Sequence, residues 1–170
     1  MKLLHLSWGD IQRLSELLAE KIRSCGFRPE IVVALGRGGF IPARILSDRL
    51  DVRELASTSI EYYRDMGERE KEPRILYPLN AEVKNRSVLL VDDVSDTGRS
   101  LQLAKSHVLE RGAKEVRVAT LHYKPWSAFQ PDFYAEKTEA WVVYPWEVLE
   151  SLRSLYKKLT EEGLGDSEIK

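Results

Sequence analysis

The sequence predicts an α/β fold, in which helices flank a mainly parallel sheet. Two apolar runs, Ile31–Leu35 and Val88–Val91, and the mostly apolar stretch Val116–Leu121 support this prediction. Continuous apolar runs of this length are typical of strands buried on both faces, such as those at the centre of a parallel sheet. Segments around these runs contain apolar residues at helical spacing, which predicts the flanking helices.

Length, charge and cysteine content limit the classes of protein to which the chain can belong. With 170 residues, we expect a single domain over residues 1–160 and a polar, frayed tail over 161–170. The net charge of −1 gives no indication of nucleic-acid or membrane binding. No apolar run approaches the ~20 residues of a spanning helix, and the first residues lack a signal-peptide pattern. The single cysteine, Cys25, excludes an internal disulfide. We therefore expect a cytoplasmic protein.

The first predicted element is a packing helix. Ser7 is placed to cap its start, and Asp10 three residues later approximates a capping box. Gly26 is a suitable end. Apolar residues recur at helical spacing between these positions: Ile11, Leu14, Leu17, Leu18 and Ile22.

A glycine-rich loop follows the strand Ile31–Leu35. Its residues, Gly36-Arg37-Gly38-Gly39, lack the spacing of a Walker loop or of a dinucleotide fingerprint. Glycines let the backbone approach a ligand closely, and Arg37 adds a permanent positive charge. Taken alone, the loop fits a ligand-binding role and an ordinary strand-to-helix turn equally well. A helix is expected next, over about Ile41–Leu50, with Pro42 in its first turn.

A charged hairpin is expected in the middle of the chain. Val52–Tyr62 alternates enough to predict a strand, and Ile75–Leu79 is expected to return beside it. Between them, Tyr63–Arg74 is almost wholly polar, which predicts a solvated tip. A turn around Asn85 and Arg86 then leads into the next strand.

The stretch VLLVDDVSDTGRSL, which starts at Val88, is the richest in chemical groups. Its apolar strand is followed by Asp92 and Asp93, which we expect beyond the strand, exposed to solvent, where open α/β sheets bind ligands. Asp96–Ser100 then forms a tight turn into a helix. Its hydroxyls, the small Gly98 and free backbone N–H groups suit a phosphate monoester. The combination indicates a phosphorylated sugar site; the alternative is a buried strand with an Asp-rich turn.

Two further segments carry candidate ligand groups. After a helix with one apolar face, ending near Gly112, the strand Val116–Leu121 leads to Lys124, which is placed to reach a ligand edge or to lie on the surface. The irregular segment Trp126–Asp132 comes next. The segment Ala140–Glu147 is expected to form a short strand that Pro145 stops, and a helix to about Leu159 follows.

The thirteen residues VLLVDDVSDTGRS resemble the 5-phosphoribosyl-1-pyrophosphate (PRPP) signature of the type I phosphoribosyltransferases. In that context the glycine loop resembles the family's pyrophosphate loop, which implies a cis peptide between Gly36 and Arg37. The family's flexible hood would correspond to Tyr63–Arg74, and Tyr62, Tyr63 and Arg64 would be the hood residues that reach the ligand. The segments KPW and WVVYPWE resemble the 6-oxopurine branch, close to bacterial xanthine–guanine enzymes and their archaeal relatives. The family fold includes a small C-terminal purine-binding cap.

The resemblance implies a role for each matching residue. Asp92 and Asp93 would bind the ribose hydroxyls, and Asp93 would lie nearest a Mg²⁺ ion. Asp96 would act as general acid or base beside purine N7. The 5′-phosphate would be held by Asp96, Thr97, Gly98, Arg99 and Ser100. Pyrophosphate would be held by Arg37, Gly38 and Gly39.

The base would be bound by residues from the two later segments. Lys124 would hydrogen-bond purine O6, Trp141 would stack on the base, and the backbone of Val142 and Val143 would meet its 2-position. A core tryptophan is the alternative for Trp141. The bacterial pattern has a carboxylate at Val143, so the preference among xanthine, guanine and hypoxanthine does not carry over.

The implied reaction is purine salvage: PRPP and a 6-oxopurine give a nucleoside 5′-monophosphate and pyrophosphate, with Mg²⁺ as cofactor. The expected partners are these small molecules, with no nucleic acid or membrane, and relatives imply a homodimer or homotetramer. One alternative is a PRPP- or nucleotide-sensing regulator with little turnover, but Asp96 and Lys124 favour an enzyme. A pyrimidine phosphoribosyltransferase fits the signature but not KPW and WVVYPWE.

Overall fold

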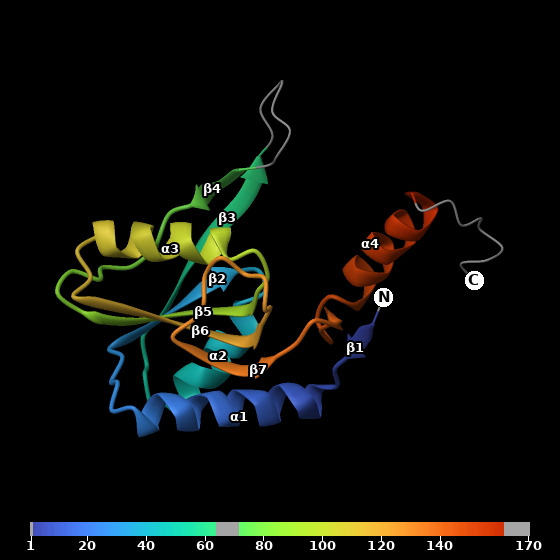
Figure 1. Cartoon of the computed structure of the whole chain (residues 1–170). Helices are drawn as coiled ribbons and strands as arrows, with labels where there is room; N and C mark the ends of the chain where they lie inside the picture. Colours follow the sequence, from blue (N-terminus) through green and yellow to red (C-terminus); the bar gives the residue numbers. More distant parts are fainter. Residues whose placement is uncertain (1, 64–71, 162–170) are drawn as a thin grey trace. The chain divides into compact units, whose positions relative to one another are not determined.

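The computed structural model describes residues 2–63 and 72–161, which belong to two compact units. The larger unit comprises Ile11–Thr138, and the smaller one combines the two ends of the chain, Met1–Asp10 and Glu139–Lys170. Figure 1 shows the elements of both. The single domain over 1–160 stays a prediction, and residues 162–170 of the expected tail lie outside the described part.

A six-stranded sheet forms the centre of the larger unit, with strand order β4-β3-β2-β5-β6-β7. Every neighbouring pair is parallel except β3 and β4. The strands are β2 (Ile31–Gly36), β3 (Leu55–Tyr63), β4 (Glu72–Tyr77), β5 (Ser87–Ser95), β6 (Glu115–Tyr123) and β7 (Phe133–Lys137). The predicted α/β fold with a mainly parallel sheet is confirmed.

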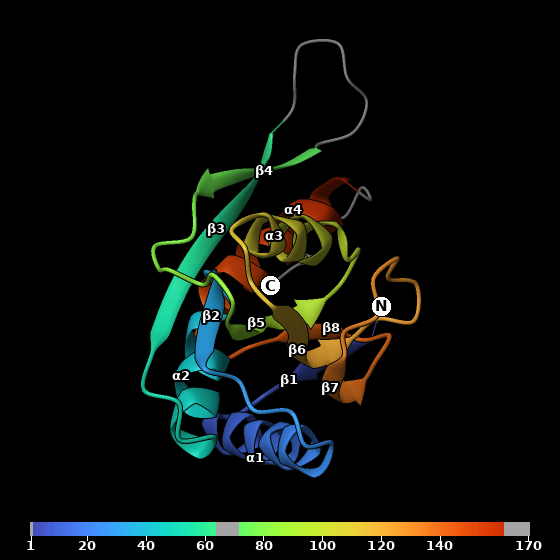
Figure 2. The same ribbon diagram turned by 90° about the vertical axis from the view of Figure 1, so that its left-hand side faces the viewer.

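Helices cover both faces of this sheet. The helix α3 (Arg99–Glu110) lies on one face, whereas α2 (Phe40–Arg49) and the part of α1 (Trp8–Ser24) that belongs to this unit lie on the other (Figures 1 and 2). The predicted capping box at the start of α1 is confirmed. The backbone N–H of Asp10 donates to Ser7 Oγ at 3.2 Å, and the Ser7 N–H donates to Asp10 Oδ2 at 2.9 Å.

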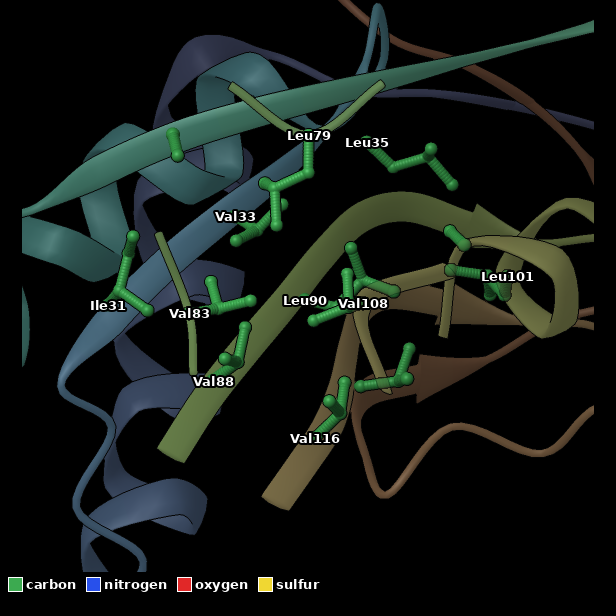
Figure 3. Packing of buried hydrophobic residues seen from close by; sticks show 13 residues of the cluster. Ile31, Val33, Leu35, Leu79, Val83, Val88, Leu90, Leu101, Val108 and Val116 are labelled. Atoms are coloured by element: carbon green, nitrogen blue, oxygen red, sulfur yellow. The ribbon is translucent and has the colours of Figure 1, made fainter. Parts of the chain in front are cut away.

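The core under α3 is built from apolar side chains of the central strands and of the helix (Figure 3). Its main members are Ile31, Val33, Leu35, Val88, Leu90, Val116, Val118, Leu101, Ala104 and Val108. The alternate residues Val32 and Leu89 are also completely buried, and side chains that alternate along a strand point to opposite faces. The central strands are therefore buried on both faces, as predicted.

Among the described residues, the smaller unit contains a two-stranded parallel sheet, the first residues of α1 and one further helix. The strand β1 (Leu3–His5) pairs with β8 (Trp141–Val143), and α4 (Val148–Glu161) follows. The rings of Tyr144 and Trp146 stack with their centroids 4.8 Å apart.

Two strands were not predicted, and several predicted ends are displaced. The unpredicted strands are the short β1 and the edge strand β7. β4 ends at Tyr77 rather than Leu79, and β6 continues to Tyr123 rather than ending at Leu121. In β6 the backbone pairing with β5 and β7 extends beyond the apolar run, because His122 pairs with both neighbours.

Candidate functional site

The sheet topology brings two loops of the larger unit together. From the adjacent central strands β2 and β5, the chain proceeds outward in opposite directions, to β3 and to β6, through helices on opposite faces. Loops at the carboxyl ends of such strands flank a crevice, which is where open α/β sheets bind ligands. The glycine loop follows β2, and the turn at Asp96–Ser100 follows β5.

The acid pair lies inside β5, not after it. Asp92 pairs with Thr120 of β6, and the strand ends only at Ser95. Asp93 is 7% exposed and Asp92 is partly buried, so the expectation of two solvated carboxylates beyond the strand is wrong. The reason is that backbone pairing with β6 continues through the polar residues. The carboxylates still occupy the carboxyl-terminal half of a central strand.

The glycine loop packs directly against this part of β5. A Cβ on Gly38 would lie 2.7 Å from Asp93 Oδ1 and closer still to Oδ2. A Cβ on Gly39 would meet the backbone of Leu35 and of Val91. Only glycine allows these close approaches. The loop contains the predicted cis peptide between Gly36 and Arg37, and the Arg37 side chain is exposed.

The turn after β5 forms a concave site at the start of α3, made by Thr97–Ser100, which we call the cup. Gly98 has a φ of +82° and precedes Arg99, the first helical residue. A Cβ on Gly98 would lie 2.6 Å from the Phe129 backbone nitrogen. The Thr97 carbonyl accepts a hydrogen bond from the Ala128 N–H at 3.1 Å. The irregular segment after β6, which contains Ala128 and Phe129, therefore packs against the cup.

Both strands that flank residues 64–71 contact this cup. From β3, the Tyr62 hydroxyl accepts a hydrogen bond from Ser100 Oγ at 2.9 Å and lies 3.4 Å from Thr97 Oγ1. From β4, Glu72 lies 3.6 Å from Arg99 as an ion pair. Of the predicted hood, residues 64–71 lie outside the described part, among them Arg64.

A cavity of about 290 Å³ joins the acid pair to the cup. Its lining consists of Tyr62, Asp92, Asp93, Val94, Ser95, Asp96, Thr97, Gly98, Ser100 and Leu101. The structure therefore brings the predicted ribose and 5′-phosphate residues together around one space, with the exception of Arg99, which is exposed and does not line the cavity.

Lys124 lies at the end of β6, beside this cavity's Asp96. Its backbone N–H donates to the Ser95 carbonyl at 3.0 Å, and the residue is 6% exposed. Burial lowers the pKa of Lys124, while the negative charge of Asp96 opposes this shift. A partly desolvated ammonium group next to a carboxylate is suited to a polar ligand edge.

Trp126 connects these two charged groups and was not among the predicted site residues. Its indole Nε1–H donates to Asp96 Oδ1 at 3.0 Å, and Lys124 Nζ lies 5.4 Å from its ring centroid. The sequence signal was its place in the KPW segment, but a sequence does not show which way an exposed side chain turns.

The remaining predicted base-binding residues belong to the smaller unit. Trp141, Val142 and Val143 form β8, where Trp141 is partly buried and lies 5.9 Å below Lys158 Nζ. The Val143 carbonyl accepts from the Leu6 N–H at 3.1 Å. Their contact with a purine stays a prediction.

The donor set at the acid pair fits Mg²⁺ only together with a substrate. Among the described residues, no group of three or more His, Cys, Asp or Glu side chains could hold a metal ion. Mg²⁺ commonly takes one or two carboxylates plus water and phosphate oxygens, and Asp92 and Asp93 could supply the carboxylates.

None of the described helices combines the length and the apolar composition that a membrane-spanning helix needs.

Comparisons with known proteins connect this geometry to a family. Residues 7–150 match the family model described as "Phosphoribosyl transferase domain". A xanthine-guanine phosphoribosyltransferase of Ruegeria sp. is 29% identical over 156 residues, which cover 85% of each chain.

Two solved structures are similar over most of the chain. A purine phosphoribosyltransferase from Pyrococcus horikoshii is 38% identical with a TM-score of 0.77, covering 86% of this chain and 94% of that one. A hypothetical protein from Neisseria gonorrhoeae, solved with bound ppGpp, is 29% identical with a TM-score of 0.76, covering 96% and 99%.

Proposed function

The chain belongs to the phosphoribosyl transferase domain family and has the type I phosphoribosyltransferase fold; from this premise we propose that it transfers the phosphoribosyl group of PRPP to a 6-oxopurine. The observation that supports the proposal most is one cavity that joins the acid pair to the cup. Lys124 lies next to Asp96, which lines this cavity. The products are a nucleoside 5′-monophosphate and pyrophosphate.

The two loops hold the two phosphate-containing ends of PRPP. The cup at Thr97–Ser100 offers hydroxyls, backbone N–H groups and the start of α3, so it binds the 5′-phosphate. Asp92 and Asp93 accept hydrogen bonds from the ribose hydroxyls. The pyrophosphate lies along Arg37, Gly38 and Gly39, because this loop packs against Asp93 and Arg37 adds a permanent positive charge.

During transfer, the bond between ribose C1 and the pyrophosphate oxygen breaks, and the leaving group takes the electron pair. A bond forms between C1 and N9 of the purine, which gives up a ring proton. Asp96 stands beside N7 and holds or exchanges the proton there as general acid or base. The positive charge of Arg37 stabilises the negative charge that develops on pyrophosphate.

A Mg²⁺ ion bound with PRPP would supply further charge neutralisation on the phosphate oxygens. Asp93, aided by Asp92, would hold it on the protein side, because both carboxylates lie where the ribose meets the pyrophosphate loop. Their number suits an ion that keeps water and phosphate ligands.

Base selection is assigned to Lys124. An ammonium group only donates hydrogen bonds, so it pairs with the carbonyl O6 of guanine, hypoxanthine or xanthine. Trp141 stacks on the base, and the backbone at Val142 and Val143 meets its 2-position. The names of the relatives, a xanthine-guanine and a purine phosphoribosyltransferase, support this substrate class. A homodimer or homotetramer stays a prediction.

A nucleotide-sensing regulator is the second candidate. It is favoured by the similar Neisseria gonorrhoeae protein, whose structure holds ppGpp. A sensor would bind PRPP or a nucleotide without turning it over.

Turnover distinguishes the two candidates. Incubation with PRPP, Mg²⁺ and guanine should yield pyrophosphate and GMP in equal amounts. Asp96→Asn should lower kcat by about 10²-fold or more, as expected for loss of a general acid or base. Asp48→Asn, at an exposed position of α2, is the matched control and should keep the parent rate. Binding without product formation for any 6-oxopurine would support the sensor instead.

A further inference from the structure

We propose that Trp126 is a positioning residue that holds Asp96 and Lys124 at the spacing required by one edge of the purine. This inference rests on the proposed function, because it assigns Asp96 to N7 and Lys124 to O6. It assigns a role to a residue of the KPW segment that was not among the predicted site residues and does not line the cavity.

The contacts of Trp126 are made to both charged groups. Its Nε1–H donates to Asp96 Oδ1 at 3.0 Å, a hydrogen bond to a carboxylate and hence among the stronger kinds. Its ring lies 5.4 Å from Lys124 Nζ, within the range of a cation–π interaction. One rigid indole therefore restrains both side chains.

Asp96 needs this restraint more than Lys124 does, because its side chain has more conformational freedom. Lys124 is buried, and its backbone is hydrogen-bonded to β5, whereas Asp96 is exposed in a turn. An exposed aspartate in a turn can adopt several rotamers, and only some would face the base. The hydrogen bond from Trp126 selects one of them.

The chemistry of the purine explains why the spacing matters. O6 and N7 lie on the same edge of the ring system, separated by two ring carbons. Lys124 donates to O6, and Asp96 must reach N7 at the same time. Small misplacements of catalytic groups reduce the rate strongly, because the reacting atoms no longer meet in the productive geometry.

A purely structural role explains Trp126 less well. The residue is 56% exposed, so it contributes little to the core. The segment's support of the cup comes instead from Ser127, Ala128 and Phe129, which contact Ser95, Thr97 and Gly98. Replacing Trp126 should therefore leave the fold and the PRPP site in place.

Two substitutions separate the two contacts. Trp126→Phe keeps an aromatic face for Lys124 but removes the N–H donor to Asp96. It should lower kcat about 10-fold and leave the KM values for PRPP and guanine within about 2-fold of the parent. Trp126→Leu also removes the ring, so it should raise the KM for guanine in addition. Trp8→Phe is the control, since Trp8 is 57% exposed and undergoes the same chemical change; it should keep the parent constants.

A spectroscopic measurement tests the hydrogen bond without turnover. The chain has four tryptophans, so the ¹⁵N-labelled protein should show four indole N–H signals. The signal missing in Trp126→Phe should shift in Asp96→Ala, while the other three stay in place. An unmoved Trp126 signal would overturn the proposal.

The kinetic outcomes are also decisive. A parent kcat in Trp126→Phe, or a loss that appears only as a higher KM for PRPP, would overturn the positioning role while leaving the proposed function intact. An unmodified protein that forms no nucleotide from PRPP with any 6-oxopurine would overturn the proposed function itself.

Discussion

At the scale of single residues, the acid pair is the centre of the proposed PRPP site. Both carboxylates line the cavity, but Asp93 is buried within β5 and touches the glycine loop, whereas Asp92 is more exposed. The Asp93 N–H donates to Asp92 Oδ1 at 2.9 Å, which orients the first carboxylate. The two residues are chemically identical but lie in different surroundings.

Asp92→Asn and Asp93→Asn should each reduce kcat/KM for PRPP by about 10- to 100-fold. Each removes one charge-assisted hydrogen bond to ribose or to the metal, worth about 1.5–3 kcal/mol. Steady-state kinetics with varied PRPP and Mg²⁺ measures the effect, and a thermal melt shows whether the fold is kept. If both variants used PRPP as efficiently as the parent, the ribose site would have been assigned to the wrong residues.

The residues whose chemistry is carried by a local motif could be predicted from sequence. The glycines, carboxylates and hydroxyls at Gly38, Asp93 and Thr97 fall in ordered patterns, and the structure brings them together. Trp126 could not be predicted, because its role depends on the direction of one side chain towards Asp96. The burial of Asp93 was also missed, since backbone pairing and not polarity determines where β5 ends.

At the scale of elements, the site depends on how closely the loop after β2 approaches β5. Gly38 and Gly39 leave no room for a Cβ between the loop and this strand. The contact between loop and strand therefore places the predicted pyrophosphate residues next to the predicted ribose residues.

Gly38→Ala should displace the Asp93 carboxylate and lower kcat/KM for PRPP by at least about 10-fold. The added methyl would meet both carboxylate oxygens, and overpacking of this kind typically costs about 1–3 kcal/mol. Gly9→Ala in α1 is the control, because its Cβ would meet Ser7 Oγ at an ordinary 3.6 Å. Parent kinetics in Gly38→Ala would contradict the close contact.

The central strands could be predicted because their apolar runs are continuous, whereas the peripheral strands could not. β1 has three residues and depends on β8, which lies at the other end of the chain. β7 alternates between buried and less buried residues over a short edge strand. Such strands are determined by partners distant in sequence, and local patterns say little about them.

At the scale of the whole molecule, stability should depend on pH through His122. This side chain in β6 is fully buried, and burial lowers its pKa from 6.5 to about 4. In the unfolded chain the imidazole binds a proton near its ordinary pKa. The unfolded state therefore binds more protons between these values, and stability is complete above about 6.5 and falls as the pH drops towards 4.

The free energy of unfolding should be lower at about pH 4.5 than at about pH 7, by on the order of 2–3 kcal/mol from this group. Urea titrations at both values measure the difference. His122→Gln should lose this part of the pH dependence, and His5→Gln, at an exposed position, should retain it. An unchanged pH dependence in His122→Gln would show that another group is responsible.

The central claim is that the molecule transfers phosphoribosyl to a 6-oxopurine that Lys124 selects. Its most direct test compares guanine, hypoxanthine, xanthine and adenine as acceptors for the unmodified protein and for Lys124→Ala, with Lys114→Ala as an exposed control. Adenine presents an amino group to the ammonium of Lys124, so a donor faces a donor and the hydrogen bond to the base is lost, at a cost of at least about 1–3 kcal/mol. We expect the unmodified protein to use at least one 6-oxopurine and to reject adenine. Lys124→Ala should lose most of the activity on 6-oxopurines, so that its rates with 6-oxopurines and with adenine differ less. Efficient use of adenine by the unmodified protein, or full activity on 6-oxopurines in Lys124→Ala, would contradict the central claim.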